Sequence, residues 1–384
     1  MSRGSGRPSP VKDRAGLLEA KRIVVKIGSS SLSSVDGGLD VGAVERLEEA
    51  LNAVLARGTQ VVLVSSGAIA AGLAPLGLER RPRDLATQQA AAGVGQGLLV
   101  AHYSRAFARH GRTVAQVLLT ADDLVRRTHY ANAYRSLDKL LALGVVPIVN
   151  ENDAVATHEI RFGDNDRLAA LVANLVKADA LVLLSDVDAV YTAPPSAGGT
   201  PLRTISSPAD LEGVTLGSSG RAGVGTGGMV TKVQAATIGA QSGIPTLVTS
   251  ATLAAEALRG EEVGTWFDAR RGRRPLRLLW LEHLATTRGR LVLDDGAVAA
   301  VGSGKRSLLA AGIVGVEGEF ASGDPVEIAG TDGKGLARGL VNYDADELAA
   351  LLGRATEELS ERLGAHYERV VVHADDLALV GAKR

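Results

Sequence analysis

The sequence predicts an α/β protein, a three-layer sandwich with a mostly parallel central sheet, followed by a small β-rich domain. Short β-branched runs alternate with stretches of helical spacing from residue 22 to residue 249, which is typical of parallel sheets crossed by helices. Small and polar residues follow several of these runs, as they do where a parallel sheet binds ligands at the carboxyl ends of its strands. Beyond Trp266 the runs shorten and turns become frequent, which indicates a separate β-rich domain.

Six strands are expected in the larger region, each a short run rich in aliphatic or β-branched residues. They cover residues 22–27, 60–64, 113–119, 145–149, 180–184 and 245–249. Apolar residues recur at helical spacing between them. These helices cover residues 41–55, 85–99 and 131–143 and the stretches that begin near 166 and 228. In the Ala/Gly-rich second helix, Gly93 and Gly95 are expected at a contact between helices rather than at a ligand.

Changes in composition divide the chain into a flexible arm, a large α/β domain, a basic linker and the β-rich domain. Their expected bounds are residues 1–18, 19–264, 265–288 and 289–384. A run of arginines between 270 and 277 favours a solvated linker over a binding site. In the last domain we expect a helix over 346–363 and a final strand over 369–372.

The overall composition argues against several classes of protein. The formal net charge is −1 and aromatic residues make up 3% of the chain, so a nucleic-acid surface is not indicated as the main function. With no cysteine there is no disulfide framework, thiol nucleophile or thiolate metal site. The histidines lack the spacing of a zinc site, and no metal ligands are predicted. Neither a signal peptide nor a membrane span is expected, and we expect a cytoplasmic protein.

The stretch SGRAGVGTGGMVTK at residues 219–232 is the clearest candidate for binding an anion. Its glycines free the backbone to bring N–H groups close to a phosphate. A helix that begins near Gly228 would add the positive end of its dipole, and Lys232, one turn into that helix, would add a full charge. A P-loop pattern is absent, and the dinucleotide fingerprint lacks its strand. A surface loop ahead of an ordinary helix is the alternative.

Further polar groups follow the strand ends. Lys26 lies in an apolar strand, so it either reaches water at a sheet edge or faces inward and needs an anionic partner. Ser65 and Ser66 can bind a carboxylate or a phosphate, or cap a helix. The remaining groups lie at 150–153, 164–166 and 185–188. For Ser65, Asp164 and Asp188, caps and turns are an equally good interpretation.

These groups favour the transfer of a phosphoryl group to a carboxylate. Such transfer needs positive charge and alignment more than it needs a base. No histidine lies in these turns, and a base is dispensable when the acceptor is a carboxylate that is already ionised at neutral pH.

Six motifs in this order resemble the amino-acid kinase family, and are most similar to its bacterial glutamate 5-kinases. They are KIGSS at 26–30, VSSGAIAAG at 64–72, NENDAV at 150–155, FGDND at 162–166, LLSDVDAVYT at 183–192 and GTGGMVTK at 225–232. From Gly289 onward the chain resembles a PUA domain, with LDDGA, KRSLLAAGIVGVEGEF and GLARGLVNY. Two departures from the family pattern are Ala189, where Gly is usual, and the Pro194-Pro195 turn.

The resemblance implies that ATP, with Mg²⁺, phosphorylates the side-chain carboxylate of L-glutamate to L-glutamyl 5-phosphate, the first step of proline biosynthesis. Lys26 and Lys232 would stabilise the transferred group, with Asp166 holding the two lysines. The residues implied to bind glutamate are Ser66, Asp153 and Asn165. Those implied to bind ATP are Lys26, Ser185, Asp186, Thr226, Gly227, Gly228, Met229, Val230, Thr231 and Lys232.

The resemblance also implies feedback inhibition by proline, through the region that follows NENDAV, and a homo-oligomer, either a dimer or a tetramer. Two alternatives stay open. One is a sister kinase that acts on aspartate, N-acetylglutamate, carbamate or UMP, although the acids and amides of residues 150–155 suit a free α-amino group. The other is an RNA-binding protein led by the PUA-like domain, against which the net charge and the few aromatic residues count.

Overall fold

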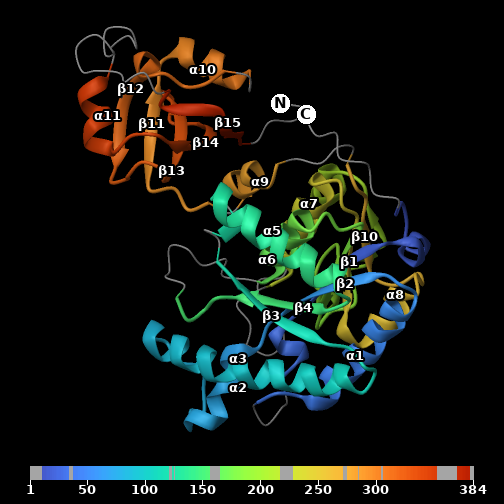
Figure 1. Cartoon of the computed structure of the whole chain (residues 1–384). Coiled ribbons are helices and arrows are strands. Elements are labelled where there is room, and N and C mark those ends of the chain that lie inside the picture. Colours follow the sequence, from blue (N-terminus) through green and yellow to red (C-terminus); the bar gives the residue numbers. More distant parts are fainter. Residues whose placement is uncertain are drawn as a thin grey trace. The chain divides into compact units, whose positions relative to one another are not determined.

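The computed structural model divides the chain into two compact units, Met1–Leu276 and Arg277–Arg384 (Figure 1). The structure describes residues 11–33, 38–120, 123–124, 126–155, 165–216, 228–270, 275–283, 285–303, 306–352 and 370–380. Among these residues, no helix combines the length and the hydrophobicity that a membrane-spanning segment requires.

An eight-stranded sheet, in the order β3-β4-β2-β1-β5-β9-β10-β8, forms the centre of the first unit. Its strands are β1 (Arg22–Ile27), β2 (Gln60–Ser65), β3 (Val114–Leu119), β4 (Val146–Glu151), β5 (Ala180–Ser185), β8 (Thr204–Ile205), β9 (Thr246–Ser250) and β10 (Thr265–Phe267). All neighbouring pairs are parallel except β9 and β10. The six expected strands are all present, and the prediction of a mostly parallel sheet is confirmed.

Helices cover both faces of this sheet (Figure 1). They are α1 (Val41–Ala56), α2 (Ala68–Leu73), α3 (Leu85–Ala108), α5 (Arg127–Ala142), α6 (Asn165–Leu175), α7 (Met229–Gln241) and α8 (Ala254–Leu258). On one face α1, α3 and α8 share a core with alternate residues of β1, namely Ile23, Val25 and Ile27. On the other face α6 packs against β1 and β5, and α7 packs against β5 and β9.

The large sheet extends further along the chain than expected. Residues 265–267 lie in the segment that the sequence assigns to the linker, yet they form β10, a strand of the large sheet. The physical reason is burial: Trp266 and Phe267 are each 2% exposed, and a place between β9 and β8 gives this short apolar run both hydrogen-bond partners and a core. Between β5 and β8 along the chain, β6 (Val190–Tyr191) and β7 (Pro201–Leu202) pair antiparallel and form a separate two-stranded sheet.

The second unit contains a five-stranded sheet in the order β12-β11-β13-β14-β15 with its own apolar core. Its elements are α9 (Leu276–His283), which begins at the boundary, β11 (Gly289–Leu293), α10 (Asp295–Gly302), β12 (Ile313–Gly318), β13 (Pro325–Gly330), β14 (Gly335–Val341), α11 (Ala345–Leu351) and β15 (Val372–Leu379). The predicted small β-rich domain is thus confirmed. The prediction of the last strand over 369–372 is wrong in its bounds, because the run that pairs with β14 begins at Val372 and continues to Leu379. Beyond residue 352, most of the expected helix over 346–363 lies outside the described residues.

Two glycines let α2 and α3 pack backbone against backbone. A Cβ added to Gly95 would lie 1.8 Å from the carbonyl oxygen of Ala68, and one added to Gly72 would lie 1.9 Å from that of Ala91. The expected helix contact is therefore confirmed for Gly95. Gly93 faces open space instead, with nothing within 4 Å of its added Cβ.

We expect Gly95→Ala to lower the free energy of unfolding by about 1–3 kcal/mol, because overpacking must push the two helices apart. The matched control is Gly93→Ala in the same helix, which should raise stability by about 0.5–1 kcal/mol through helix propensity alone. Urea unfolding of both variants measures the difference. Equal effects of the two substitutions would contradict the close contact.

Candidate functional site

The alternation of side chains along β1 turns Lys26 toward α6 and α7. Successive residues of a strand face opposite sides of the sheet, and Ile23, Val25 and Ile27 occupy the core under α1. Lys26 therefore faces the opposite side, where it is 3% exposed. Since β1 lies between β2 and β5, the alternative of an edge-strand lysine is excluded.

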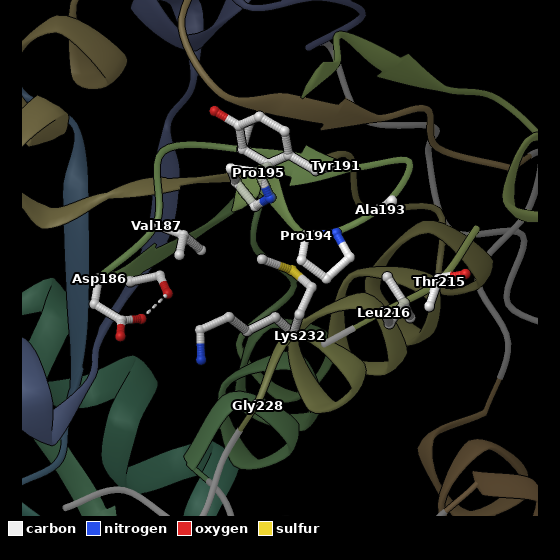
Figure 2. Close-up of a pocket in the computed structure, with 13 residues that line it drawn as sticks. Asp186, Val187, Tyr191, Ala193, Pro194, Pro195, Thr215, Leu216, Gly228 and Lys232 are labelled. Carbon is white, nitrogen blue, oxygen red and sulfur yellow. Dashed lines mark hydrogen bonds between the residues drawn. The ribbon is translucent and has the colours of Figure 1, made fainter. Parts of the chain in front are cut away.

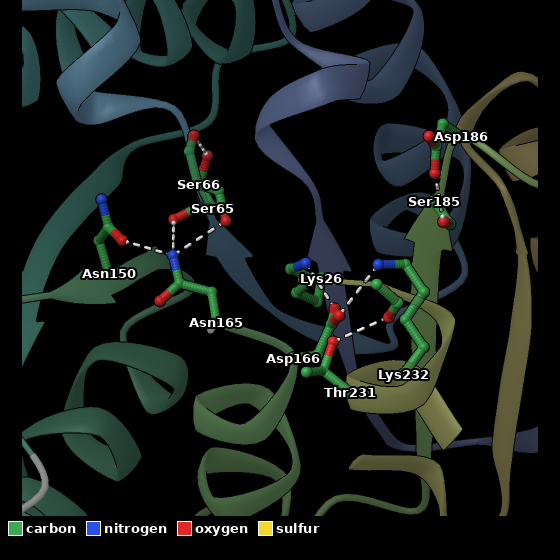
Figure 3. Close-up of polar contacts among 11 residues, drawn as sticks. Lys26, Ser65, Ser66, Asn150, Asn165, Asp166, Ser185, Asp186, Thr231 and Lys232 are labelled. Carbon is green, nitrogen blue, oxygen red and sulfur yellow. Dashed lines mark hydrogen bonds and ion pairs between the residues drawn. The ribbon is translucent and has the colours of Figure 1, made fainter. Parts of the chain in front are cut away.

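The residues that surround the Lys26 ammonium group come from the first turns of α6 and α7. Asp166 is the second residue of α6, and α7 begins at Met229 directly after Gly228, as expected, with Lys232 in its first turn. Lys26 Nζ lies 2.5 Å from Asp166 Oδ1, and Lys232 Nζ lies 3.1 Å from Asp166 Oδ2. Figure 3 shows the carboxylate between the two ammonium groups. We call these three residues the charge cluster.

The charge cluster holds one carboxylate between two cations away from water. Burial by itself raises the pKa of the Asp166 carboxyl, but the charges of Lys26 and Lys232 and their hydrogen bonds outweigh it, so that this pKa lies below its ordinary value. Asp166 is therefore ionised at neutral pH. Two ammonium groups face one carboxylate, and the remaining positive charge favours an incoming anion.

A second group of polar side chains gathers around the amide of Asn165, the first residue of α6. Its Nδ2 donates to Asn150 Oδ1 at 2.8 Å, to Ser66 Oγ at 2.9 Å and to the carbonyl oxygen of Ser65 at 3.1 Å. Figure 3 shows these bonds beside the charge cluster. The structure thus brings together Ser66 and Asn165, two of the three residues predicted to bind the acceptor. The third, Asp153, is half-buried in a turn two residues beyond β4.

A pocket of about 170 Å³ opens beside Lys232 (Figure 2). Five residues predicted to bind ATP line it: Ser185, Asp186, Gly228, Met229 and Lys232. The Ser185 hydroxyl donates to Asp186 Oδ1 at 3.0 Å. The rest of the lining is largely apolar, which suits a flat heterocycle. It includes Val187, Tyr191, Pro194 and Leu216.

Val230 and Thr231, although predicted to bind ATP, are not among the residues that line this pocket. Val230 is 38% exposed on α7, and the Thr231 hydroxyl donates to the Gly228 carbonyl within its own helix at 2.9 Å. Thr226, Gly227 and Asp164 lie outside the described residues. Asp188 accepts from the Tyr191 hydroxyl at 2.9 Å, which supports the interpretation of Asp188 as a turn residue.

The sequence interpretation did not assign roles to three buried polar residues at the site. Asn150 is 1% exposed and bonds Asn165. Gln96 and Tyr103, both in α3, bond Asn150 and Ser65 respectively. For Gln96 and Tyr103 the signal was present in the spacing, since 92, 96, 99 and 103 recur on one helical face that is otherwise apolar. Thr215 and Leu216 also line the pocket, but they lie in a segment without periodicity, which gave no signal.

Both parts of the chain match families of known proteins. Residues 21–250 match the amino acid kinase family. The chain belongs to this family. Residues 289–363 match the PUA domain, so the fold expected from the motifs is confirmed in both parts.

Curated relatives match along almost the whole chain. A glutamate 5-kinase of Streptomyces coelicolor is 62% identical over 96% of this chain and 98% of the relative. One of Salinispora arenicola is 64% identical over 96% of this chain and 100% of the relative. The resemblance to glutamate 5-kinases is thereby confirmed. Among solved structures, a carbamate kinase from Giardia lamblia bound to AMP-PNP is 19% identical, with a TM-score of 0.49 over 66% of this chain and 100% of that chain.

Asp166→Asn should leave two buried ammonium groups without their carboxylate. We expect the free energy of unfolding at pH 7 to fall by about 3–5 kcal/mol, as when one partner of a buried ion pair is removed. The folded-state pKa of Asp166 is lowered, so its contribution is complete above the ordinary value of 3.8 and is lost as the pH falls below it. Urea unfolding of both proteins at several pH values measures this difference.

The control is Asp332→Asn, which removes the exposed partner of Lys334 in the second unit and should change stability little. If Asp166→Asn costs no more than this control at pH 7, the charge cluster does not stabilise the fold. If its cost does not shrink below pH 3.8, the carboxylate is not the stabilising group.

Proposed function

We propose that this protein transfers the γ-phosphoryl group of ATP to the side-chain carboxylate of L-glutamate, giving L-glutamyl 5-phosphate and ADP, the first step of proline biosynthesis. The observation that carries the proposal is the charge cluster. Two buried lysines from β1 and α7 converge on one carboxylate, between the pocket beside Lys232 and the Asn165 amide. The relatives that match along almost the whole chain are glutamate 5-kinases.

The lysines suit a reaction whose charge builds up on phosphoryl oxygens. Lys232 of α7 lines the pocket, and Lys26 approaches Asp166 from β1, so the two ammonium groups can contact the transferred group from two sides. Asp166 holds both side chains in place before substrates arrive, which is the preorganisation that electrostatic catalysis requires. No general base is needed, because a carboxylate acceptor with a pKa of about 4 is already ionised at neutral pH.

ATP would lie along the pocket, with its base among the apolar residues around Tyr191 and Pro194 and its phosphates near Gly228 and Lys232. Ala189 and the Pro194-Pro195 turn, the two departures from the family pattern, also line this pocket. For the bound state we propose that the N–H groups at the start of α7 contact the phosphates.

We propose Mg²⁺ as the counter-ion of the nucleotide. Among the described residues no group of three or more His, Cys, Asp or Glu side chains could hold a metal ion. The carboxylate of Asp186, exposed at the mouth of the pocket, is of the donor type that magnesium prefers. Phosphate oxygens and water would supply the other ligands, as is usual for this ion, which neutralises phosphate charge when bound.

Glutamate would bind with its side-chain carboxylate toward the charge cluster and its amino-acid end toward Ser66, Asp153 and Asn165. An amide oxygen and a carboxylate are suitable acceptors for an α-ammonium group. This arrangement favours an unblocked amino acid over N-acetylglutamate or UMP as the acceptor.

The remaining expectations are also proposals. They are inhibition by proline, assembly into a dimer or a tetramer, a cytoplasmic location, the end of the N-terminal arm at residue 18 and the start of the PUA-like domain after residue 288. The region implied in proline inhibition begins after residue 155 and lies largely outside the described residues. RNA binding by the PUA-like domain stays a hypothesis, and an RNA mobility shift at low salt would test it.

The first experiment measures hydroxamate formation, in which hydroxylamine traps an acyl phosphate, with ATP and Mg²⁺ and each of glutamate, aspartate and N-acetylglutamate. We expect signal with glutamate. Lys232→Ala should lower it at least about a hundredfold, because a charge that stabilises the transition state is lost. Lys139→Ala, a matched change at an exposed lysine of α5, should leave the rate unchanged.

Signal with another acid would keep the chemistry and overturn the substrate. No signal with any carboxylate would contradict acyl-phosphate formation. An active Lys232→Ala variant would remove Lys232 from the proposed role.

A further inference from the structure

Gln96 is a buried polar residue with no role in the activity proposed above. It lies in α3, whose neighbouring buried positions are Ala92, Leu99 and Tyr103, and it is 7% exposed. Its Oε1 accepts a hydrogen bond from Asn150 Nδ2 at 2.8 Å, across 54 residues of sequence. A buried amide in an otherwise apolar helix face needs a reason, because burying it without partners is costly.

The orientation of each amide in this network follows from a backbone group. The N–H of Glu151 donates to one side-chain atom of Asn150 at 2.8 Å, and only the carbonyl oxygen can accept it. That atom is therefore Oδ1, and the other atom is the donor Nδ2. Asn150 then accepts from Asn165 through Oδ1 and donates to Gln96 through Nδ2. Gln96 must present its oxygen to Asn150.

The same reasoning fixes the amide of Asn165. Its nitrogen faces two oxygens that can only accept, the Ser65 carbonyl and Asn150 Oδ1, together with the Ser66 hydroxyl. In Figure 3 the nitrogen points toward these residues and the oxygen points away from them. Asn165 Oδ1 is buried, and it has no hydrogen-bond partner among the described residues. Among the described residues, the network thus ends in a carbonyl oxygen without a hydrogen-bond donor, at the site proposed for glutamate.

We propose that Gln96 is a positioning residue for that site. By accepting from Asn150, it holds Asn150 and, through it, Asn165 in the one orientation that presents Asn165 Oδ1 to an ammonium group. This inference rests on the proposed function and deepens it. It assigns to α3 a part in distinguishing an α-amino dicarboxylate from the same dicarboxylate without its amino group.

The effect depends on the loss of one partner. Without an acceptor at position 96, Asn150 Nδ2 is left buried and unpaired, and Asn150 gains by turning toward other partners. Asn165 Nδ2 then loses one of its three acceptors and keeps the Ser65 carbonyl and the Ser66 hydroxyl, so that its amide is held less firmly. The charge cluster and the nucleotide pocket contain neither Gln96 nor Asn150, so phosphoryl transfer itself is not expected to change.

The test compares glutamate with glutarate, which lacks the amino group, in the full-length Gln96→Leu variant. The KM for glutamate should rise about tenfold, the factor that corresponds to one lost hydrogen bond to a charged group, with kcat and the KM for ATP within about twofold of wild type. Glutarate, measured as a substrate or, if it is not phosphorylated, as a competitive inhibitor, should keep its wild-type affinity.

Two further variants separate positioning from packing. Gln96→Glu keeps an oxygen that accepts from Asn150, so the preference for glutamate over glutarate should stay at or above the wild-type value, because the added charge repels the more anionic glutarate at least as strongly. The matched control is Gln60→Leu. Gln60 begins β2, at the end of that strand opposite to Ser65, and bonds Arg22 and the Leu141 carbonyl. Its preference should equal that of wild type. Thermal unfolding monitors folding in all three variants.

A glutamate KM in Gln96→Leu within about twofold of wild type would overturn the inference, as would an equal loss of affinity for glutarate. If Gln96→Leu fails to fold, Gln96→Glu still tests it, since a collapsed preference in that folded variant would contradict the role of the oxygen acceptor. Absence of hydroxamate from wild type with glutamate would instead refute the proposed function, so the two failures are distinguishable.

Discussion

The charge cluster of Lys26, Asp166 and Lys232 is the interaction on which the rest of the site depends. A buried carboxylate is tolerable only with opposite charge and hydrogen bonds around it, and here each of its oxygens has an ammonium group within 3.1 Å. Those contacts fix the first turns of α6 and α7 against the end of β1. The same contacts leave an excess of positive charge where the two proposed substrates would meet.

Two different kinds of polar contact therefore lie side by side. Around Asp166 the contacts are ionic, and they suit a group whose charge develops during reaction. Around Asn165 they are neutral amides and hydroxyls, which recognise by geometry and by the separation of donors from acceptors. Asn165 and Asp166 are adjacent residues at the start of α6, so a single helix terminus carries one residue of each group. This adjacency links the position of the acceptor to that of the transferred group.

Local patterns predicted a large part of this arrangement. The six main strands follow from aliphatic runs, and the start of α7 at Met229 follows from the glycines before it. The order of the motifs was enough to assign the family. The alternation along β1 could not by itself choose between an exposed and a buried Lys26, because that depends on whether β1 is central or at an edge. Likewise, three residues of the assumed linker join the sheet as β10 only because β9 offers them an edge.

The sequence by itself determined which residues carry charge, where the strands end and which helices begin beside those ends, because backbone preferences act over a few neighbouring residues. Only the tertiary structure decided the partners. Asp166 and Lys232 are 66 residues apart, and Gln96 and Asn150 are 54 apart. Such pairs depend on the order of the strands and on how closely α3 packs against the large sheet. No local spacing encodes either of these. The physical reason is that each helix or strand forms from a local pattern of residues, whereas the partner of a side chain depends on which distant elements the folded chain brings together.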